Sequence, residues 1–415
     1  MRASRELAIG KIGLGLAAAV LCALSSAAWS ADKISVRYLA QGKKVIPVTC
    51  AIGNWQITDI KLPELILTNN QKLPVTVDKV EVVGTVSGVE TVRMQISSDQ
   101  LWEAIRKAAV WINDPATQLP FVQLSYGNVV LPAGPLSLNG MAAQGQSVLL
   151  PLSTIAYLHY VGQTKLDGME ILLTVRSGWK RAVIPFPVQL TFYQTKSTYL
   201  FPVKGDVRMA YTPLSYIHHR ASASQEYGMD VVSANQPGAA SYTDISRPDP
   251  KTLTDYGIWG REVFTAADGV VVETGTKFPE DRMSDPALFT QPGYVQNLLK
   301  ELIPQIGFTN ALAGNYVVID HQNGEFSIYC HLQEGSIRVK AGDRVQKGAV
   351  IAGVGNTGNS GAPHLHFQLM DSPDFFTANG LPWMFENVSP HAIISEYPVT
   401  ANSMSFSDSI FVTVP

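Results

Sequence analysis

The stretch GAPHLHFQLM, residues 361–370, decides how the C-terminal part of the chain is interpreted. It places His364 and His366 two residues apart, with Leu365 between them. Successive side chains of a strand point to opposite faces, so the two imidazoles share one face. The loop before them, GNTGNSGAP, is rich in turn residues, and such loops commonly line functional grooves. The pattern predicts a metal site beside this strand.

Two other segments offer further groups for the site. The run SIYCHL carries His331, which a neighbouring strand would bring near His364. The run QEYGMDVV carries Glu226 and Asp230, which point to the same side in an extended segment. Zinc takes imidazole nitrogen and carboxylate oxygen as ligands. Glu226, Asp230 and His366 are therefore candidate metal ligands, and His331 and His364 remain for catalysis or for supporting the ligands.

Length and composition bound the class of protein. With 415 residues, 46% hydrophobic and 16% charged, the chain is long enough for two or three packed domains. The formal net charge of −3 argues against nucleic acid as the main partner. Arg2, Arg5 and Lys11 precede an apolar run at 12–24 and a series of small residues. This pattern is typical of a secretory signal peptide, predicted over 1–31, and places the protein in the periplasm or outside the cell.

Two cysteines remain once the predicted signal peptide is removed. Cys50 and Cys330 lie in what we expect to be separate domains, so a disulfide between them is not expected. Cys330 alternates with His331 along its strand, so its thiol is expected to face the core and to point away from the imidazole.

The first half of the chain predicts a β-sandwich-like domain over residues 32–200. Short β-rich runs, PFVQLSYG at 120–127 among them, are separated by glycine, proline and asparagine. One helix interrupts them at 97–113, where Ser97 and Gln100 suggest a capping box. This half contains no recognisable catalytic group, so a binding, spacing or shielding role is expected.

The second half has a different character. Residues 201–395 contain β runs with tight glycine turns and form a second predicted domain. Insertions near 233–255 and 277–314 interrupt it, and the second insertion includes a helix predicted to start near Pro292. Residues 396–415 are expected to be a C-terminal tail. The chain as a whole is thus predicted to be mainly β.

The YCHL element followed by VKAGDRVQKGAVIAGVGNTGNSGAPHLHFQL resembles the lysostaphin/LytM-type zinc metallopeptidases, which cut peptidoglycan cross-bridges. The resemblance covers about residues 205–395 and extends to AADGVVVETG and GNYVVIDHQNG. It implies an antiparallel β groove domain of the duplicated-hybrid-motif type that binds a single Zn²⁺ ion. The implied partners are peptidoglycan peptides, with another cell-wall enzyme or envelope protein as a partner of the N-terminal domain.

The resemblance also assigns roles. It implies that His366 and Asp230 bind the metal and that His364 and His331 are the catalytic histidines. The family pattern has a histidine four residues before the aspartate, where this chain has Glu226.

Three interpretations of Glu226 remain open. Glu226 itself binds zinc, or His218 or His219 reaches the metal along a different loop path, or the site has lost tight metal binding. The first two favour a zinc endopeptidase that hydrolyses peptidoglycan stems or cross-links. The third favours a non-hydrolytic module that binds wall peptides or activates a cell-wall amidase.

Overall fold

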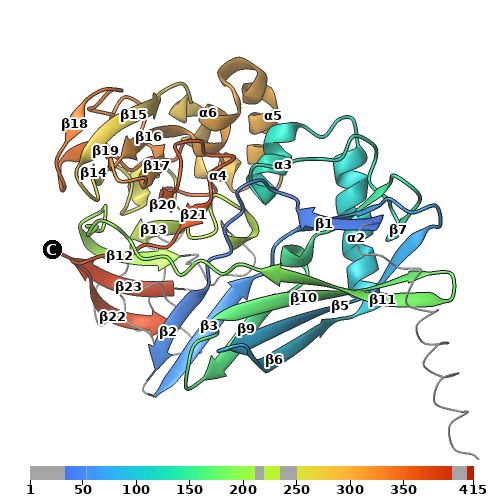
Figure 1. Ribbon diagram of the computed structural model, residues 1–415. Helices are drawn as coiled ribbons and strands as arrows, with labels where there is room; N and C mark the ends of the chain where they lie inside the picture. The colour runs from blue at the N-terminus through green and yellow to red at the C-terminus, as the bar shows by residue number, and fades with distance from the viewer. Residues whose placement is uncertain (1–32, 53, 211–218, 234–249, 395–408) are drawn as a thin grey trace, which may run out of the picture.

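The computed structural model describes residues 33–52, 54–210, 219–233, 250–394 and 409–415 (Figure 1). The predicted signal peptide, His218 and most of the insertion near 233–255 lie outside these ranges. No helix within them is long and apolar enough to cross a membrane.

Antiparallel sheets form the N-terminal half, as the β-rich runs predict. Alternation of buried and outward residues is clearest in Gly168–Ser177, where every second side chain is buried. The sheets of the described residues are β1 (Ile34–Tyr38), β4 (Leu65–Asn69) and β8 (Ser147–Leu150); β2 (Val48–Ile52), β3 (Trp55–Lys61) and β9 (Tyr157–Gly162); and β11 (Lys180–Val188), β10 (Gly168–Ser177), β5 (Val75–Val86) and β6 (Val89–Ile96), with β7 (Met141–Ala142) beside β5.

The helix predicted at 97–113 is confirmed as α2 (Ser98–Asn113). The Ser97 hydroxyl accepts a hydrogen bond from the Gln100 backbone N–H and donates one to the Gln100 side chain. The prediction of a β run at 120–127 is wrong, because this segment forms helix α3 (Leu119–Tyr126). A proline in its first turn suits a helix start, and a short apolar run alone does not distinguish strand from helix.

A large antiparallel sheet forms the C-terminal half and gives the chain its mainly β character. The end of the chain, predicted as a tail, supplies a strand between β12 and β22. In the described residues the strand order is β18 (Arg344–Val345), β15 (Gly269–Gly275), β16 (Asn315–Asp320), β17 (Phe326–Leu332), β20 (Leu365–Met370), β13 (Met229–Ser233), β12 (Gly205–Ala210), β23 (Ser409–Val414) and β22 (Ser389–Ile394), with β21 (Gly380–Leu381) beside β20 and a separate pair of β14 (Glu262–Phe264) and β19 (Val350–Gly353).

The two faces of this sheet have different roles. Side chains such as Phe367 and Tyr329 pack into a hydrophobic core on one face. On the other face, the second insertion covers Ile328 and its neighbours with helices, and its longest helix begins close to the predicted Pro292. The longest helix of the insertion is α5 (Tyr294–Ile306), and the remaining helices of the described residues are η2 (Leu152–Thr154), η3 (His219–Ala221), η4 (Leu253–Asp255), η5 (Glu280–Met283), α4 (Pro286–Phe289) and α6 (Phe308–Ala313).

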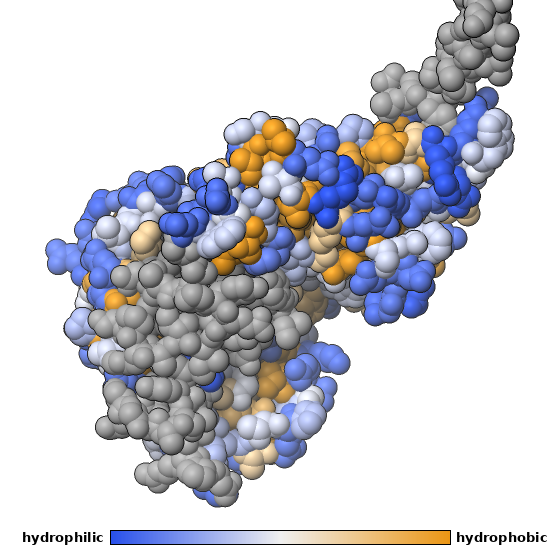
Figure 2. Space-filling model, turned by 90° about the horizontal axis from the view of Figure 1, so that it is seen from below, coloured by the Kyte–Doolittle hydropathy of each residue, from blue (hydrophilic) through white to orange (hydrophobic). Residues whose placement is uncertain are grey.

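The two halves share buried contacts. Helix α3 lies beside α5 and α6 (Figure 1), and the rings of Phe121 and Phe308 meet edge to face with centroids 5.3 Å apart. Ile46 and Ile57 of the N-terminal half belong to the same buried cluster as Phe367. On the face seen in Figure 2, the coloured hydrophobic side chains form separate patches divided by hydrophilic ones.

Candidate metal centre

Asp230 of β13 and His366 of β20 are direct partners on neighbouring antiparallel strands. Opposed residues of such a pair project to the same face of the sheet. Asp230 Oδ1 lies 3.0 Å from His366 Nδ1, and both side chains are buried. The strand register therefore brings together the two candidate ligands on which the sequence analysis and the family resemblance agree.

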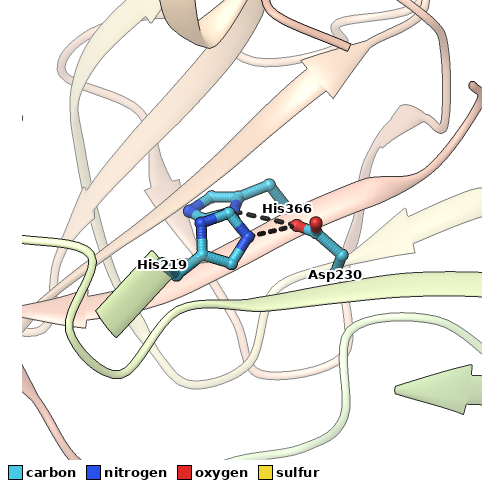
Figure 3. A group of neighbouring side chains, drawn as sticks. All are labelled: His219, Asp230 and His366. Carbon is cyan, nitrogen blue, oxygen red and sulfur yellow. Dashed lines mark hydrogen bonds and ion pairs between the residues drawn. The ribbon is translucent and has the colours of Figure 1, made fainter. Parts of the chain in front are cut away.

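His219 completes the cluster from outside the sheet. It begins the short 3₁₀ helix η3, and its Nε2 lies 2.9 Å from Asp230 Oδ1 and 3.3 Å from His366 Nδ1. Figure 3 shows both imidazoles turned toward the Asp230 carboxylate. One donor atom from each residue lies within 4.8 Å of the others. Two imidazole nitrogens and one carboxylate oxygen are a donor set that suits a catalytic zinc ion, which keeps its fourth position for water.

Gly228 makes this close packing possible. A Cβ at position 228 would lie 2.9 Å from His366 Cε1 and 3.4 Å from His219 Cγ. The first of these distances is shorter than real Cβ contacts allow, so a larger residue would displace a neighbour. The glycine lets the chain pass directly beside both imidazoles.

Two glutamine side chains contact the rings of His366 and His219. Gln368 donates from its Nε2 to the Ser224 carbonyl, so its oxygen accepts from His366 Nε2 at 2.7 Å. Gln225 Oε1 lies 3.2 Å from His219 Nδ1. When the other ring nitrogen is a donor, His366 Nδ1 and His219 Nε2 keep their lone pairs for a metal. The residues present therefore fit a bound ion.

Electrostatics favours the protonation states that metal ligands need. Burial raises the pKa of Asp230, but attraction to His219 and His364 outweighs it and holds the pKa well below its usual range. Burial lowers the pKa of His219. Burial also lowers the pKa of His331 well below its usual range, and repulsion from His364 and His366 adds to this. A carboxylate and neutral imidazoles are the forms that bind metal.

Glu226 lies apart from this group in the structure. Its Oε2 is 3.4 Å from Lys43 Nζ, in a buried contact with the N-terminal half. The expectation that Glu226 and Asp230 point the same way assumed an extended segment. Instead, Gly228 N–H donates to the Gln225 carbonyl at 2.7 Å, so a turn separates the two carboxylates. Within the described residues, the three donors are those of the alternative that used His219.

His331 reaches the same groove through an unusual backbone conformation. Cys330 opposes His366 across β17 and β20, so strict alternation would turn His331 to the far face. His331 has a φ of 61°, which is rare for a residue with a side chain. Cys330 is part of the buried cluster that packs against the helices of the second insertion, as expected of a core residue, and it also lines the same pocket as His331, so the two residues do not face away from each other. Cys330 is a free, buried thiol.

The two remaining histidines lie side by side. The ring centroids of His331 and His364 are 4.5 Å apart. His331 Nδ1 is 2.6 Å from the Thr357 carbonyl, and His364 Nδ1 is 2.8 Å from the Ala362 carbonyl. Each ring thus donates through Nδ1 to the backbone and keeps Nε2 for the groove.

These groups line a pocket of 630 Å³. The sheet supplies its polar floor, and Leu312 and Ala313 of the second insertion form part of its wall. Leu124 of α3 also lines it, so the N-terminal half contributes to the groove. A hollow in which a few polar groups converge among apolar side chains is typical of a binding or active site.

Comparison with known proteins identifies the family of part of this region. Residues 302–377 match peptidase family M23. The chain contains an M23 peptidase domain. This confirms the resemblance seen in the sequence. The M23 match includes His331, His364 and His366, whereas His219 and Asp230 precede it.

The relatives share only part of their length with this chain. It is 31% identical over 152 residues to the peptidoglycan DD-endopeptidase ShyA of Vibrio cholerae, covering 36% of this chain and 27% of that protein. It is 42% identical over 69 residues to the glycyl-glycine endopeptidase ALE-1 of Staphylococcus capitis, covering 16% and 18%. The solved lysostaphin catalytic domain of Staphylococcus simulans is 20% identical, with a TM-score of 0.22, over 44% of this chain and 87% of that one.

Sequence reasoning missed the groups that support the M23 site. Gln368 follows His366 by two residues and shares its face, so alternation alone was a sufficient signal for it. Gln225 and Leu124 had no such signal, because each depends on how a loop or a helix from elsewhere packs onto the sheet.

Proposed function

We propose that this chain is an exported, zinc-dependent endopeptidase that hydrolyses peptide bonds in peptidoglycan stems or cross-links. The observation that carries the proposal is the convergence of His219, Asp230 and His366 donors beneath the His331–His364 pair. The M23 match and the names of the relatives support peptidoglycan as the substrate. The predicted signal peptide supports export.

The proposed division of labour follows from the donor atoms. His219, Asp230 and His366 would hold a zinc ion, which would supply Lewis acidity to acidify a water molecule and polarise the scissile carbonyl. His331 and His364 present Nε2 atoms to the same groove, where a neutral ring accepts a proton from the attacking water. The protonated ring then gives this proton to the leaving amine. A C–O bond to the water oxygen has then formed, and the C–N bond of the peptide has broken.

The residues that line the groove are compatible with a bound peptide. Its floor consists of sheet residues, and Leu312 and Leu124 line it from opposite halves of the chain. We therefore propose that the peptide lies over β13, β20 and β17.

The proposal is tested by zinc analysis together with digestion of purified peptidoglycan. The full chain should hold about one zinc ion and release new amino groups from the wall, as expected of a catalytic zinc site. The His219→Ala variant and the chelator-treated protein should do neither. Zinc binding without cleavage, or peptide binding without zinc, would instead support the non-hydrolytic alternative.

A further inference from the structure

The segment that carries the His219 ligand is fixed by the N-terminal half of the chain. Lys61 Nζ donates to the Ser222 carbonyl at 3.2 Å, and Ala223 N–H donates to the Leu124 carbonyl at 3.0 Å. The Tyr227 hydroxyl donates to a backbone carbonyl of that half at 2.6 Å. The loop leading from η3 to β13 therefore runs along a surface that the first half provides.

A buried ion pair between the halves lies next to the candidate ligand His219. Arg220 follows His219 in η3, and its Nη2 lies 2.6 Å from Asp59 Oδ1 of β3. Both side chains are fully buried. Tyr157 of β9 supports the guanidinium, which lies 4.8 Å from the centre of its ring. His159 Nδ1 lies 3.3 Å from the other Asp59 oxygen, so both carboxylate oxygens have partners.

Glu226 belongs to the same buried contact region. Its carboxylate faces Lys43, and charges on Lys61 and Arg220 lie near enough to interact with it. Glu226 thus takes part in the contact between the halves, although the family has a metal ligand at this position. The η3 turn, which carries both Arg220 and His219, brings the replacement donor to the metal.

The C-terminal sheet holds a different part of the loop. The Ser224 hydroxyl donates to the Phe375 carbonyl at 2.6 Å, and Gln368 donates to the Ser224 carbonyl. These contacts lie several residues beyond His219. Arg220 is the anchored residue adjacent to the ligand, and the Ser222 N–H donates to the His219 carbonyl at 2.9 Å to close the turn.

From this arrangement we infer that Asp59 and Arg220 are positioning residues for the metal ligand His219, so that the N-terminal half completes the metal centre. The inference rests on the zinc site of the proposed function. It gives the N-terminal half a role in building the site, besides any role in binding the wall.

A double-mutant cycle on zinc affinity tests the inference. Asp59→Asn and Arg220→Met each remove one charge, and the double variant removes both and leaves no unpaired buried charge. Loss of a group that orients a metal ligand typically lowers affinity about 10- to 100-fold. Each single variant and the double variant should show a loss of that size, and the two single effects should not add.

The controls separate positioning from general damage. Asp78→Asn removes the carboxylate that pairs with Arg176 on another sheet of the N-terminal half, and it should leave zinc affinity unchanged. Competition with a coloured chelator gives the affinity, the visible absorption of the Co²⁺-loaded protein reports the ligand geometry, and circular dichroism of the metal-free protein reports folding. The Co²⁺ spectrum should change in the Asp59 and Arg220 variants and stay constant in Asp78→Asn.

The outcomes are distinguishable from failure of the metal site itself. If the wild type binds no zinc, or His219→Ala binds it normally, the proposed site is wrong. If His219→Ala loses zinc but the folded Asp59→Asn/Arg220→Met variant keeps wild-type affinity and spectrum, the positioning role is overturned. Purely additive single effects would also overturn it.

Discussion

His219 Nε2 lies 2.9 Å from Asp230 Oδ1, although eleven positions separate the two residues in the sequence. The contact completes the candidate donor group of His219, Asp230 and His366. In the family pattern the corresponding histidine lies only four residues before the aspartate. Glu226, which occupies the position of that histidine, pairs with Lys43 instead. Each of the consequences below can be measured.

If His219 is the third metal ligand, variants of His219 and Glu226 should differ in zinc affinity. His219→Ala should lower zinc affinity more than about 100-fold, because it removes a donor and not only its support. Glu226→Gln should still bind about one zinc ion per chain, because Glu226 is not among the three donors, although breaking its buried contact with Lys43 should lower the free energy of unfolding. Elemental analysis after dialysis measures both, and the reverse order would restore Glu226 as the ligand.

Variants of the two proposed catalytic histidines should lose peptidoglycan cleavage but keep metal binding. His331→Ala and His364→Ala should each lower the rate of peptidoglycan cleavage by about 10²- to 10⁴-fold, because a positioned proton donor or acceptor is lost. Both variants should retain zinc, since neither residue belongs to the donor group. Equal loss of zinc and of activity would assign these residues to the metal centre instead.

Gly228 should tolerate no side chain. In Gly228→Ala, the new methyl group would lie 2.9 Å from His366 Cε1 and 3.1 Å from the Gln225 carbonyl oxygen, so the imidazole or the turn must move. A displacement of this kind in a catalytic site can cost about 100-fold in rate. Gly361→Ala is the matched control at the edge of the pocket, where a Cβ meets no atom within 4 Å. Equal activity of both variants would contradict the tight packing described here.

Buried Lys61 predicts a pH dependence of stability. Burial lowers the pKa of Lys61 to about 8, against attraction from Glu226 and Glu64 and with repulsion from Lys43 and Arg220. Between pH 8 and 10.5 the unfolded chain therefore binds more protons than the folded chain, and stability rises with pH.

The size of this effect follows from the pKa shift. Relative to Lys61→Met, the wild type should gain about 3 kcal/mol in free energy of unfolding across that window. Denaturant unfolding at several pH values measures it. The Lys79→Met variant is the control, because that lysine lies in a surface ion pair on β5 and should not change the slope. The same slope in wild type and Lys61→Met would contradict the prediction.

Much of the site could be predicted because it lies on regular strands. His364 and His366 follow the two-residue period of a strand, and the pairing of His366 with Asp230 needs only that β13 and β20 be neighbours. The choice between Glu226 and His219 could not be made. It depends on the turn at Gly228 and on the path of a loop, and neither has a repeating pattern.

The contacts between the halves were also beyond sequence reasoning. Arg220 and Asp59 are ordinary charged residues in the sequence, and only the packed structure shows that both are buried. The helix at Leu119–Tyr126 was predicted as a strand because its short apolar run carries no clear period. Its contact with Phe308 is a tertiary interaction that local propensity does not contain.

The most direct test of the central claim is anomalous X-ray scattering at the zinc edge from crystals of the zinc-loaded chain. We predict a single strong peak in contact with His219 Nε2, Asp230 Oδ1 and His366 Nδ1. A peak bound by Glu226 in place of His219, or no peak beside Asp230 and His366, would contradict the account.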